Sequence, residues 1–190
     1  MEADWSVEIG PDLPSVVVPW EGFVDLRNKS RDTLQIINEA ASHPSLREAL
    51  FTLNSKDSPV FTSKCDAWSL DGGEIDKDEF GATDERANCG FAAYIDVLIR
   101  DRDRFRAFEF HELWVRDLTR ELRTRELPDG RIEFVVRSAT VQSNSGFAVT
   151  IYAAGCGADP PAAYSSWETV LRAAVNATMS LAHLSPHMGE

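Results

Sequence analysis

The chain has few cysteines, no long apolar run and a shortage of basic residues. Its three cysteines include no CxxC pair, which argues against a disulfide framework or a thiolate metal site and favours reduced thiols inside a cell. No stretch reaches the roughly 18 uninterrupted apolar residues that a membrane-spanning helix needs. The acidic segment 1–14 lacks the basic and apolar regions of a signal peptide. We therefore expect a cytoplasmic protein that does not associate with membranes.

Recognisable catalytic and metal-binding motifs are also missing. His111-Glu112 matches the start of an HExxH zinc motif, but the second histidine is absent. His111 falls in the middle of an apolar helical stripe, where a hydrogen-bonded core histidine is the expected role. The other histidines, His43, His183 and His187, show no spacing that indicates a site. The sequence therefore predicts neither a metal ion nor another cofactor, and it favours a protein without enzymatic activity.

What the chain does have is acidity, with 31 acidic against 19 basic residues and a net charge of −12. The first 99 residues hold 19 of the acidic and 8 of the basic side chains, which gives them a net charge of −11. Repulsion from such a surface disfavours nucleic acids and anionic membranes, and it favours a basic partner. High solubility is the alternative interpretation of the same charge.

The densest acidic run covers residues 71–86. Asp76, Asp78, Gly81 and Asp84 stand at positions 1, 3, 6 and 9 of a calcium-binding loop pattern. Positions 5 and 12 are apolar, so an inner carboxylate and the bidentate glutamate are missing. A solvated acidic loop between two strands is the stronger interpretation. This acidic loop is the segment that we expect a basic partner to contact.

Arginines alternate with aspartates over residues 100–106. The segment has the basic residues of a phosphate-binding patch, but Asp101 and Asp103 nearly cancel their charge. We interpret it as the solvated start of a helix with local ion pairs.

Apolar periodicity predicts eight main elements and one edge strand. Helical spacing indicates helices over residues 30–43, 45–53, 101–127 and 160–182. Alternating apolar residues indicate strands over 60–70, 88–99, 131–142 and 146–155, the last two joined by a turn at 143–146. The edge strand lies within residues 16–26 and is interrupted by Pro19. We expect a capping box at Ser45-Leu46-Arg47-Glu48 and a cap at Asp159.

The order α-α-β-β-α-β-β-α predicts an α+β fold, in which an antiparallel sheet of four to five strands carries helices mainly on one face. We expect a single domain over residues 15–184, preceded by a flexible acidic segment, 1–14, and followed by a tail, 185–190. Between residues 169 and 182 the last helix has a single charged side chain, Arg172, so both of its sides need cover. The sheet, the helix over 101–127 or a second subunit in a homo-oligomer could supply that cover.

The strand pattern also predicts which side chains the sheet turns away from the helices. With Phe91, Ile95, Phe134 and Ile151 under the helices, the opposite face presents a polar and aromatic set. Tyrosine, tryptophan and arginine in that set are typical of protein interfaces. We predict that the partner-binding residues are Asp66, Trp68, Tyr94, Asp96, Glu133, Arg137 and Tyr152 of this face, beside Lys64, together with Asp76 and Asp78 of the acidic loop. A solvated face, or one covered by the N-terminal segment, is the alternative.

A second candidate site is the Gly155-Cys156-Gly157 turn between a strand and a helix. This placement can lower the pKa of a thiol or cradle an anion, but Asp159 at the helix start opposes both effects. Cys65 and Cys89 have the parity of the covered face, where a thiol behaves as a small apolar group.

Charge and missing motifs together lead to the functional hypothesis. It is an acidic, cytoplasmic, non-enzymatic interaction protein, such as an inhibitor, an immunity-type factor or a chaperone-like factor. A protein partner would bind to the uncovered sheet face and the acidic loop. The alternative is a small enzyme or ligand-binding domain with a pocket near the Gly155-Cys156-Gly157 turn.

Overall fold

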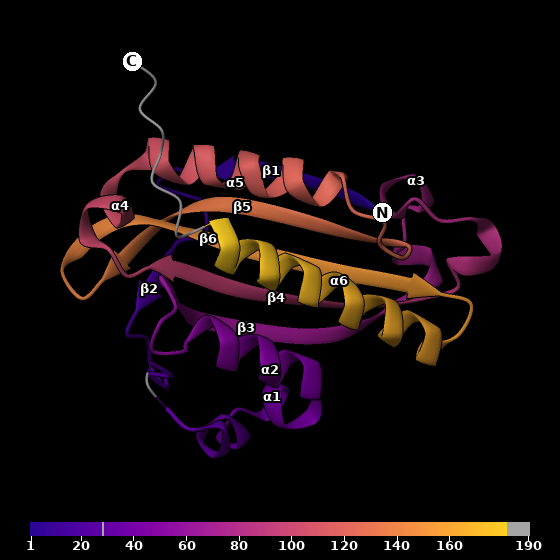
Figure 1. Cartoon of the computed structure of the whole chain (residues 1–190), viewed down its shortest axis with the longest axis horizontal. Helices are drawn as coiled ribbons and strands as arrows, with labels where there is room; N and C mark the ends of the chain where they lie inside the picture. The colour runs from indigo at the N-terminus through magenta and orange to yellow at the C-terminus, as the bar shows by residue number, and fades with distance from the viewer. Residues whose placement is uncertain (28, 182–190) are drawn as a thin grey trace.

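The computed structural model describes residues 1–27 and 29–181, which form a mixed sheet with helices packed against it (Figure 1). The strands are β1 (Glu2–Glu8), β2 (Val16–Val18), β3 (Val60–Asp71), β4 (Cys89–Ile99), β5 (Gly130–Val141) and β6 (Asn144–Gly157). The α-helices are α1 (Asn38–Ser42), α2 (Pro44–Leu53), α3 (Lys77–Phe80), α4 (Arg102–Arg106), α5 (Phe108–Arg123) and α6 (Pro160–Leu181). The 3-10 helices are η1 (Arg31–Ile36), η2 (Gly72–Glu74) and η3 (Asp84–Arg86). The predicted α+β class is confirmed, while the predicted tail, His183 and His187 lie outside the described residues.

The sheet is mixed rather than antiparallel, because two N-terminal strands run parallel to β5. The strand order is β1-β5-β6-β4-β3, and β2 pairs with β5 further along the same edge. The prediction of a flexible segment over residues 1–14 is therefore wrong for residues 2–8. Ala3 is fully buried and Trp5 packs against the core, whereas Glu2, Asp4 and Glu8 occupy the other side of β1. These acidic residues made the segment look solvated and hid an alternating strand pattern.

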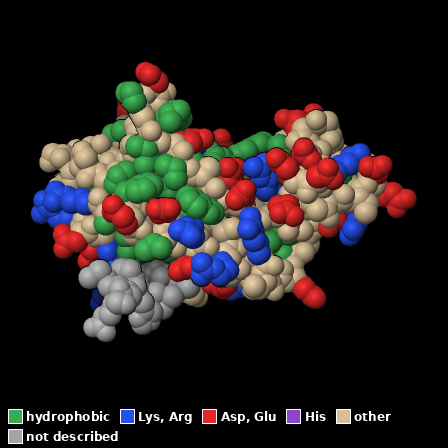
Figure 2. Space-filling view, turned by 90° about the horizontal axis from the view of Figure 1, so that it is seen from above, with side chains coloured by type: hydrophobic (Ala, Val, Ile, Leu, Met, Phe, Trp, Pro, Cys, Tyr) green, Lys and Arg blue, Asp and Glu red, His purple; other side chains and the backbone are tan. Residues whose placement is uncertain are grey.

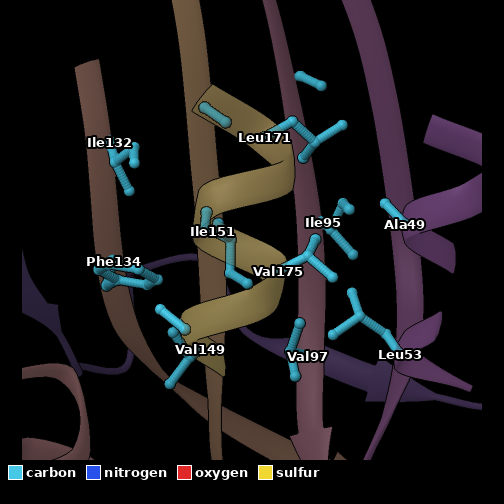
Figure 3. Packing of buried hydrophobic residues seen from close by; sticks show 14 of the residues in the cluster. Ala49, Leu53, Ile95, Val97, Ile132, Phe134, Val149, Ile151, Leu171 and Val175 are labelled. Atoms are coloured by element: carbon cyan, nitrogen blue, oxygen red, sulfur yellow. The ribbon is translucent and has the colours of Figure 1, made fainter. Parts of the chain in front are cut away.

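The main core lies between the sheet and the helices α2, α5 and α6. Figure 3 shows the sheet residues Ile132, Phe134, Val149, Ile151, Ile95 and Val97 facing α6, with Leu171 and Val175 of α6 and Ala49 and Leu53 of α2 beside them. All four residues that we predicted under the helices belong to this cluster. Their alternation along β4, β5 and β6 is what directs one face of the sheet to the core.

Helix α6 owes its apolar composition to cover on several sides within the chain. It packs on β6 and β4 and also contacts α2 and α5, and Val170, Ala174 and Ala177 are buried. The side chains that remain exposed include Arg172 and Asn176. The observation that suggested a homo-oligomer through this helix is thus explained without a second subunit. No helix in residues 1–27 and 29–181 is both long enough and apolar enough to span a membrane.

The helix predicted over residues 101–127 is two helices. Ala107 adopts an extended conformation, with φ −89° and ψ 107°, and separates α4 from α5. His111 is fully buried in α5, and its Nδ1 lies 2.9 Å from the carbonyl oxygen of Ala107. Burial lowers the pKa of His111 and so favours the neutral ring. The expected role of His111 as a hydrogen-bonded core residue is confirmed.

Several local predictions at element ends are corrected by the structure. Helix α2 begins at Pro44 without a capping box, and the hydroxyl of Ser45 donates instead to Glu168 of α6. Proline tolerates this first-turn position because it has no N–H to satisfy. The β5–β6 turn is at residues 142–143 rather than 143–146, so β6 is longer than predicted. Residues 31–42 form η1 and α1 instead of one helix, whereas Asp159 caps α6 as expected by accepting the N–H of Ala162 at 2.9 Å.

The outer face, defined as the sheet face opposite α2, α5 and α6, is covered at both ends. At one end the cluster consists of Val16, Val18, Phe61, Leu98, Phe105, Ala139 and Ala148. At the other end, the acidic loop folds back and forms a cluster of Ile75, Phe80, Ala87 and Cys156. The middle of the outer face is left between them, and this is where the partner-binding residues that we predicted on the sheet lie.

Candidate functional site

The outer face brings the predicted sheet residues together in one row across four strands. Asp66 of β3 pairs with Tyr94 of β4, Tyr94 pairs with Tyr152 of β6, and Tyr152 pairs with Glu133 of β5. Trp68 follows Asp66 by two residues on the same face of β3. Strand pairing therefore determines the spacing of these side chains, because opposite residues on neighbouring strands have adjacent Cβ atoms.

The aromatic members of the row form a continuous surface. The ring centroids of Trp68 and Tyr94 are 6.4 Å apart, and those of Tyr94 and Tyr152 are 5.9 Å apart. Trp68 is 38% exposed. Burial, reinforced by the charges of Asp96 and Asp66, raises the pKa of Tyr94 to about 12. Its hydroxyl therefore remains protonated at neutral pH, and the rings present a large apolar area with polar tips.

Arg137 borders the aromatic row but is already engaged within the protein. Its Nη2 donates to Glu8 at 2.8 Å and to the hydroxyl of Tyr152 at 3.3 Å. The guanidinium also lies 5.9 Å from the centroid of the Tyr152 ring. Arg137 therefore joins β1 to the row and positions Tyr152, in addition to the partner-binding role that we predicted for it.

Asp96 lies below the surface rather than on it. The residue is 6% exposed, and its Oδ1 accepts a hydrogen bond of 2.6 Å from Thr150. Burial raises the pKa of the carboxyl, while Thr150, Arg137 and Lys64 act in the opposite direction. Lys64 is exposed, with its ammonium 5.3 Å from the centroid of the Trp20 ring. The expectation that Asp96 is accessible to a partner is wrong, because its short side chain turns to Thr150 within the face.

The Asp96→Asn substitution is expected to raise the free energy of unfolding at pH 7, on the order of 1 kcal/mol. The pKa of Asp96 in the folded protein lies above the unfolded value of 3.8. The contribution of its protonated carboxyl to the free energy of unfolding is therefore fully present below pH 3.8 and is lost as the pH rises through the folded-state pKa. At neutral pH the buried charge is unfavourable, and an amide can still accept from Thr150. Urea denaturation at pH 7 and pH 4 should show a difference between the proteins that shrinks at pH 4. A less stable variant at pH 7 would mean that attraction to Arg137 and Lys64 outweighs burial.

The acidic loop is ordered by its own residues. The carboxylate of Asp76 caps α3 by accepting the N–H groups of Asp78 and Glu79 at 3.0 and 3.3 Å. Gly81 ends α3 with φ 62°, a left-handed conformation that favours glycine. Phe80, on the same short helix, is buried against the end of the outer face. Asp78 stays exposed beside the sheet, whereas Asp76 is occupied by the cap.

A hollow of about 200 Å³ lies between the acidic loop and the aromatic row. We call it the glutamate hollow, and its lining includes Trp68, Leu70, Phe80, Ala92, Tyr152, Ala154, Glu74, Glu79, Arg131 and Glu133. Ala92 and Ala154 pair across β4 and β6, and two short side chains side by side leave a depression between larger neighbours. Glu79 and Glu133 both pair with Arg131. Three glutamates against one arginine leave the lining negative.

Sequence reasoning missed most of the glutamate hollow. Strand parity places Ala92, Ala154 and Arg131 on the outer face, and that signal was available. The contribution of Phe80 and Glu79 was not, because it depends on the acidic loop folding back over the sheet.

Figure 2 shows acidic and basic side chains interspersed towards the end that carries α3, and apolar side chains gathered nearer the start of α5. Large apolar side chains that are exposed on the described part of the chain include Val7, Ile9, Leu13 and Leu113.

Gly155, Cys156 and Gly157, which we predicted as a turn, form the last part of β6 and have the properties of a packing contact. A Cβ at Gly155 would lie 2.2 Å from the backbone nitrogen of Trp167, and one at Gly157 would lie 2.5 Å from that of Ala163. Cys156 is 2% exposed, and burial together with Asp129 raises the pKa of its thiol. Cys65 on the covered face behaves similarly, since burial raises its pKa to about 12. Neither thiol has the low pKa of a nucleophile.

Neither a search for metal-binding groups nor comparisons with known proteins give a further indication of function. Within the part of the chain that the structure describes, no group of three or more His, Cys, Asp or Glu side chains is arranged to hold a metal ion. Comparisons with protein-family models, curated proteins and solved structures found no match for this chain. The functional argument therefore depends on the chemistry of the outer face.

Proposed function

We propose that this chain is an acidic, non-enzymatic interaction protein of the cytoplasm that binds a basic protein partner. The partner would contact the aromatic row of the outer face and the acidic loop, as an inhibitor, an immunity-type factor or a chaperone-like factor would. The observation that carries the proposal is the glutamate hollow, where exposed Trp68 adjoins Glu74, Glu79 and Glu133.

The chemistry of the hollow suits a lysine or arginine side chain of the partner. Such side chains place an apolar stem on apolar surface and keep a charged head in a polar environment. Trp68 and Tyr152 offer ring faces to the stem or to the cation, and Ala92 and Ala154 leave room beneath it. The net charge of −12 would attract a basic partner from a distance and increase its association rate.

The test is a capture experiment with the intact protein and a double variant, Trp68→Ala with Tyr94→Ala. We expect the protein to retain a basic partner in stoichiometric amount at roughly 0.05 M salt and to release it at roughly 0.5 M, where screening shortens the range of the charges. The double variant should capture at least about tenfold less, because aromatic residues at the centre of an interface contribute much of the affinity. Mass spectrometry identifies the partner, and circular dichroism verifies the fold.

The matched control is Leu113→Ala, which removes an apolar side chain from α5, outside the outer face, that is at least as exposed as Trp68. It should leave capture unchanged. Equal losses in Leu113→Ala and in the double variant would contradict the proposal, as would a partner that remains bound when both Trp68 and Tyr94 are absent.

A further inference from the structure

A second and larger hollow lies at the end of the sheet opposite α3, next to α4. It encloses about 540 Å³, a volume within the usual range for small-molecule sites. We call it the arginine hollow, and the residues that matter to its chemistry are Arg27, Arg100, Arg102, Phe61, Phe105 and Asn144. Asp25 is the carboxylate in its lining. A concentration of arginines of this kind is unexpected in a chain whose net charge is −12.

Neutral backbone groups hold one of these arginines in place. Arg100 donates from Nε to the carbonyl oxygen of Val60 at 2.8 Å, and from Nη2 to those of Asn54 and Ser55 at 3.1 and 3.0 Å. Burial and the charge of Arg27 lower the pKa of Arg100. Carbonyl oxygens fix the direction of the guanidinium but leave its positive charge uncompensated.

Arg27 is the arginine of the hollow that does have an acidic partner. It pairs with Asp25 through hydrogen bonds of 2.9 and 2.7 Å. Its guanidinium also lies 4.7 Å from the centroid of the Phe61 ring. The pair with Asp25 leaves Arg100 and Arg102 as the positive charges that face the hollow.

Two further guanidinium groups converge on one neutral atom. Arg102 and Arg106 both donate to Oδ1 of Asn144, at 3.1 and 3.0 Å. Among residues 1–27 and 29–181, no carboxylate forms an ion pair with Arg100, Arg102 or Arg106.

The sequence-based expectation of local ion pairs therefore does not hold for these three arginines. Asp101 was expected to offset their charge, but its Oδ1 accepts the backbone N–H of Arg104 at 2.8 Å and so caps α4. Two cations directed at one amide oxygen repel each other unless an anion binds nearby.

We propose that the arginine hollow binds a small molecule that carries a phosphate group. Arg100 and Arg102 bind the phosphate, because guanidinium groups form short, charge-assisted hydrogen bonds with its oxygens. The rest of the ligand packs on Phe61 and Phe105, which are buried beside the arginines. A small anion contacts only this hollow, whereas a nucleic acid would extend over the acidic surface and be repelled. This site is separate from the glutamate hollow and does not depend on the proposed partner.

Titrations of the isotope-labelled full chain with inorganic phosphate and with phenyl phosphate test the site. The chemical shifts of the backbone amides are measured by NMR during each titration, at constant ionic strength. We expect saturable shifts at residues 100–106 and at Asn144, with phenyl phosphate binding at least about threefold more tightly because its ring adds apolar contact. Equal affinities of the two probes would overturn the role of Phe61 and Phe105. An absence of saturation by either probe at about 20 mM, far weaker than a functional phosphate site, would overturn the whole proposal.

The matched variants are Arg102→Gln and Arg120→Gln, which remove the same charge from two exposed positions. Arg102→Gln should weaken phenyl phosphate binding about tenfold or more, since it removes a charge-assisted contact. Arg120 lies on α5 and pairs with Asp117, so its loss should change the affinity by less than about twofold through long-range charge alone. Equal effects of the two variants would show a general charge effect and overturn the assignment. Neither side chain belongs to a core cluster, so both variants should fold.

Discussion

The Gly155→Ala variant is expected to lose about 3 kcal/mol or more of unfolding free energy, because it forces helix α6 away from strand β6. A Cβ at this position would lie 2.2 Å from the backbone nitrogen and 2.7 Å from the Cα of Trp167. Backbone atoms cannot rotate out of the way as a side chain can. Trp167 is fully buried and in contact with Phe91, so a shift of α6 opens the main core at one of its largest residues.

Gly73→Ala is the matched control for this prediction. A Cβ at Gly73 would meet nothing within 4 Å, so its effect should stay within about 0.5 kcal/mol. Urea denaturation followed by tryptophan fluorescence gives both values. If Gly155→Ala stayed within about 1 kcal/mol of the unchanged protein, the close approach of α6 to β6 would be refuted.

The second large effect is expected from Ala3→Asp, which places a carboxylate in the core beneath β1. Ala3 is fully buried, and the cost of burying an unpaired charge there should be about 3 kcal/mol or more, enough to detach the strand. Arg123 would not neutralise the new carboxylate, because its Nε already donates to the carbonyl oxygen of Ala3 and its Nη2 pairs with Asp4. Hydrogen exchange should show that the amides of residues 2–8 lose protection, and urea denaturation should show the loss of stability.

Ile9→Asp provides the comparison for Ala3→Asp. Ile9 lies just beyond β1 and is 40% exposed, so the new charge remains hydrated and should cost less than about 0.5 kcal/mol. Similar small effects at both positions would mean that residues 2–8 are the flexible segment that their acidity suggested. The pair of variants therefore distinguishes a structural strand from a solvated tail.

Local patterns were sufficient to predict the elements at the centre of the fold. The alternation along β4, with Phe91 and Ile95 on one side and Tyr94 on the other, identified both the strand and its two faces. The apolar run between residues 169 and 182 likewise predicted a helix that needs cover on both sides. Such predictions succeed because neighbouring residues in the chain determine the period, and the period determines which side chains are buried together.

Other parts of the fold have no comparable local signal. The acidic residues of β1 favoured the prediction of a solvated segment. In the structure this segment pairs with β5 as a strand, because Ala3 and Trp5 pack against the core. The break at Ala107 and the start of α2 at Pro44 depend on how each helix meets the sheet and α6. Burial against distant segments outweighs weak local preferences, so these details follow from tertiary packing.

The candidate sites show the same division more clearly. The amino-acid sequence by itself determined the acidity, the α+β class and the aromatic row of Trp68, Tyr94 and Tyr152, because charge and strand parity are properties of the chain. Only the tertiary structure decided that the acidic loop folds back beside Trp68, and that two arginines of α4 converge on Asn144 of β6. These contacts join residues that are far apart in the chain, and the free energy of burying apolar surface, rather than any local spacing, brings them together.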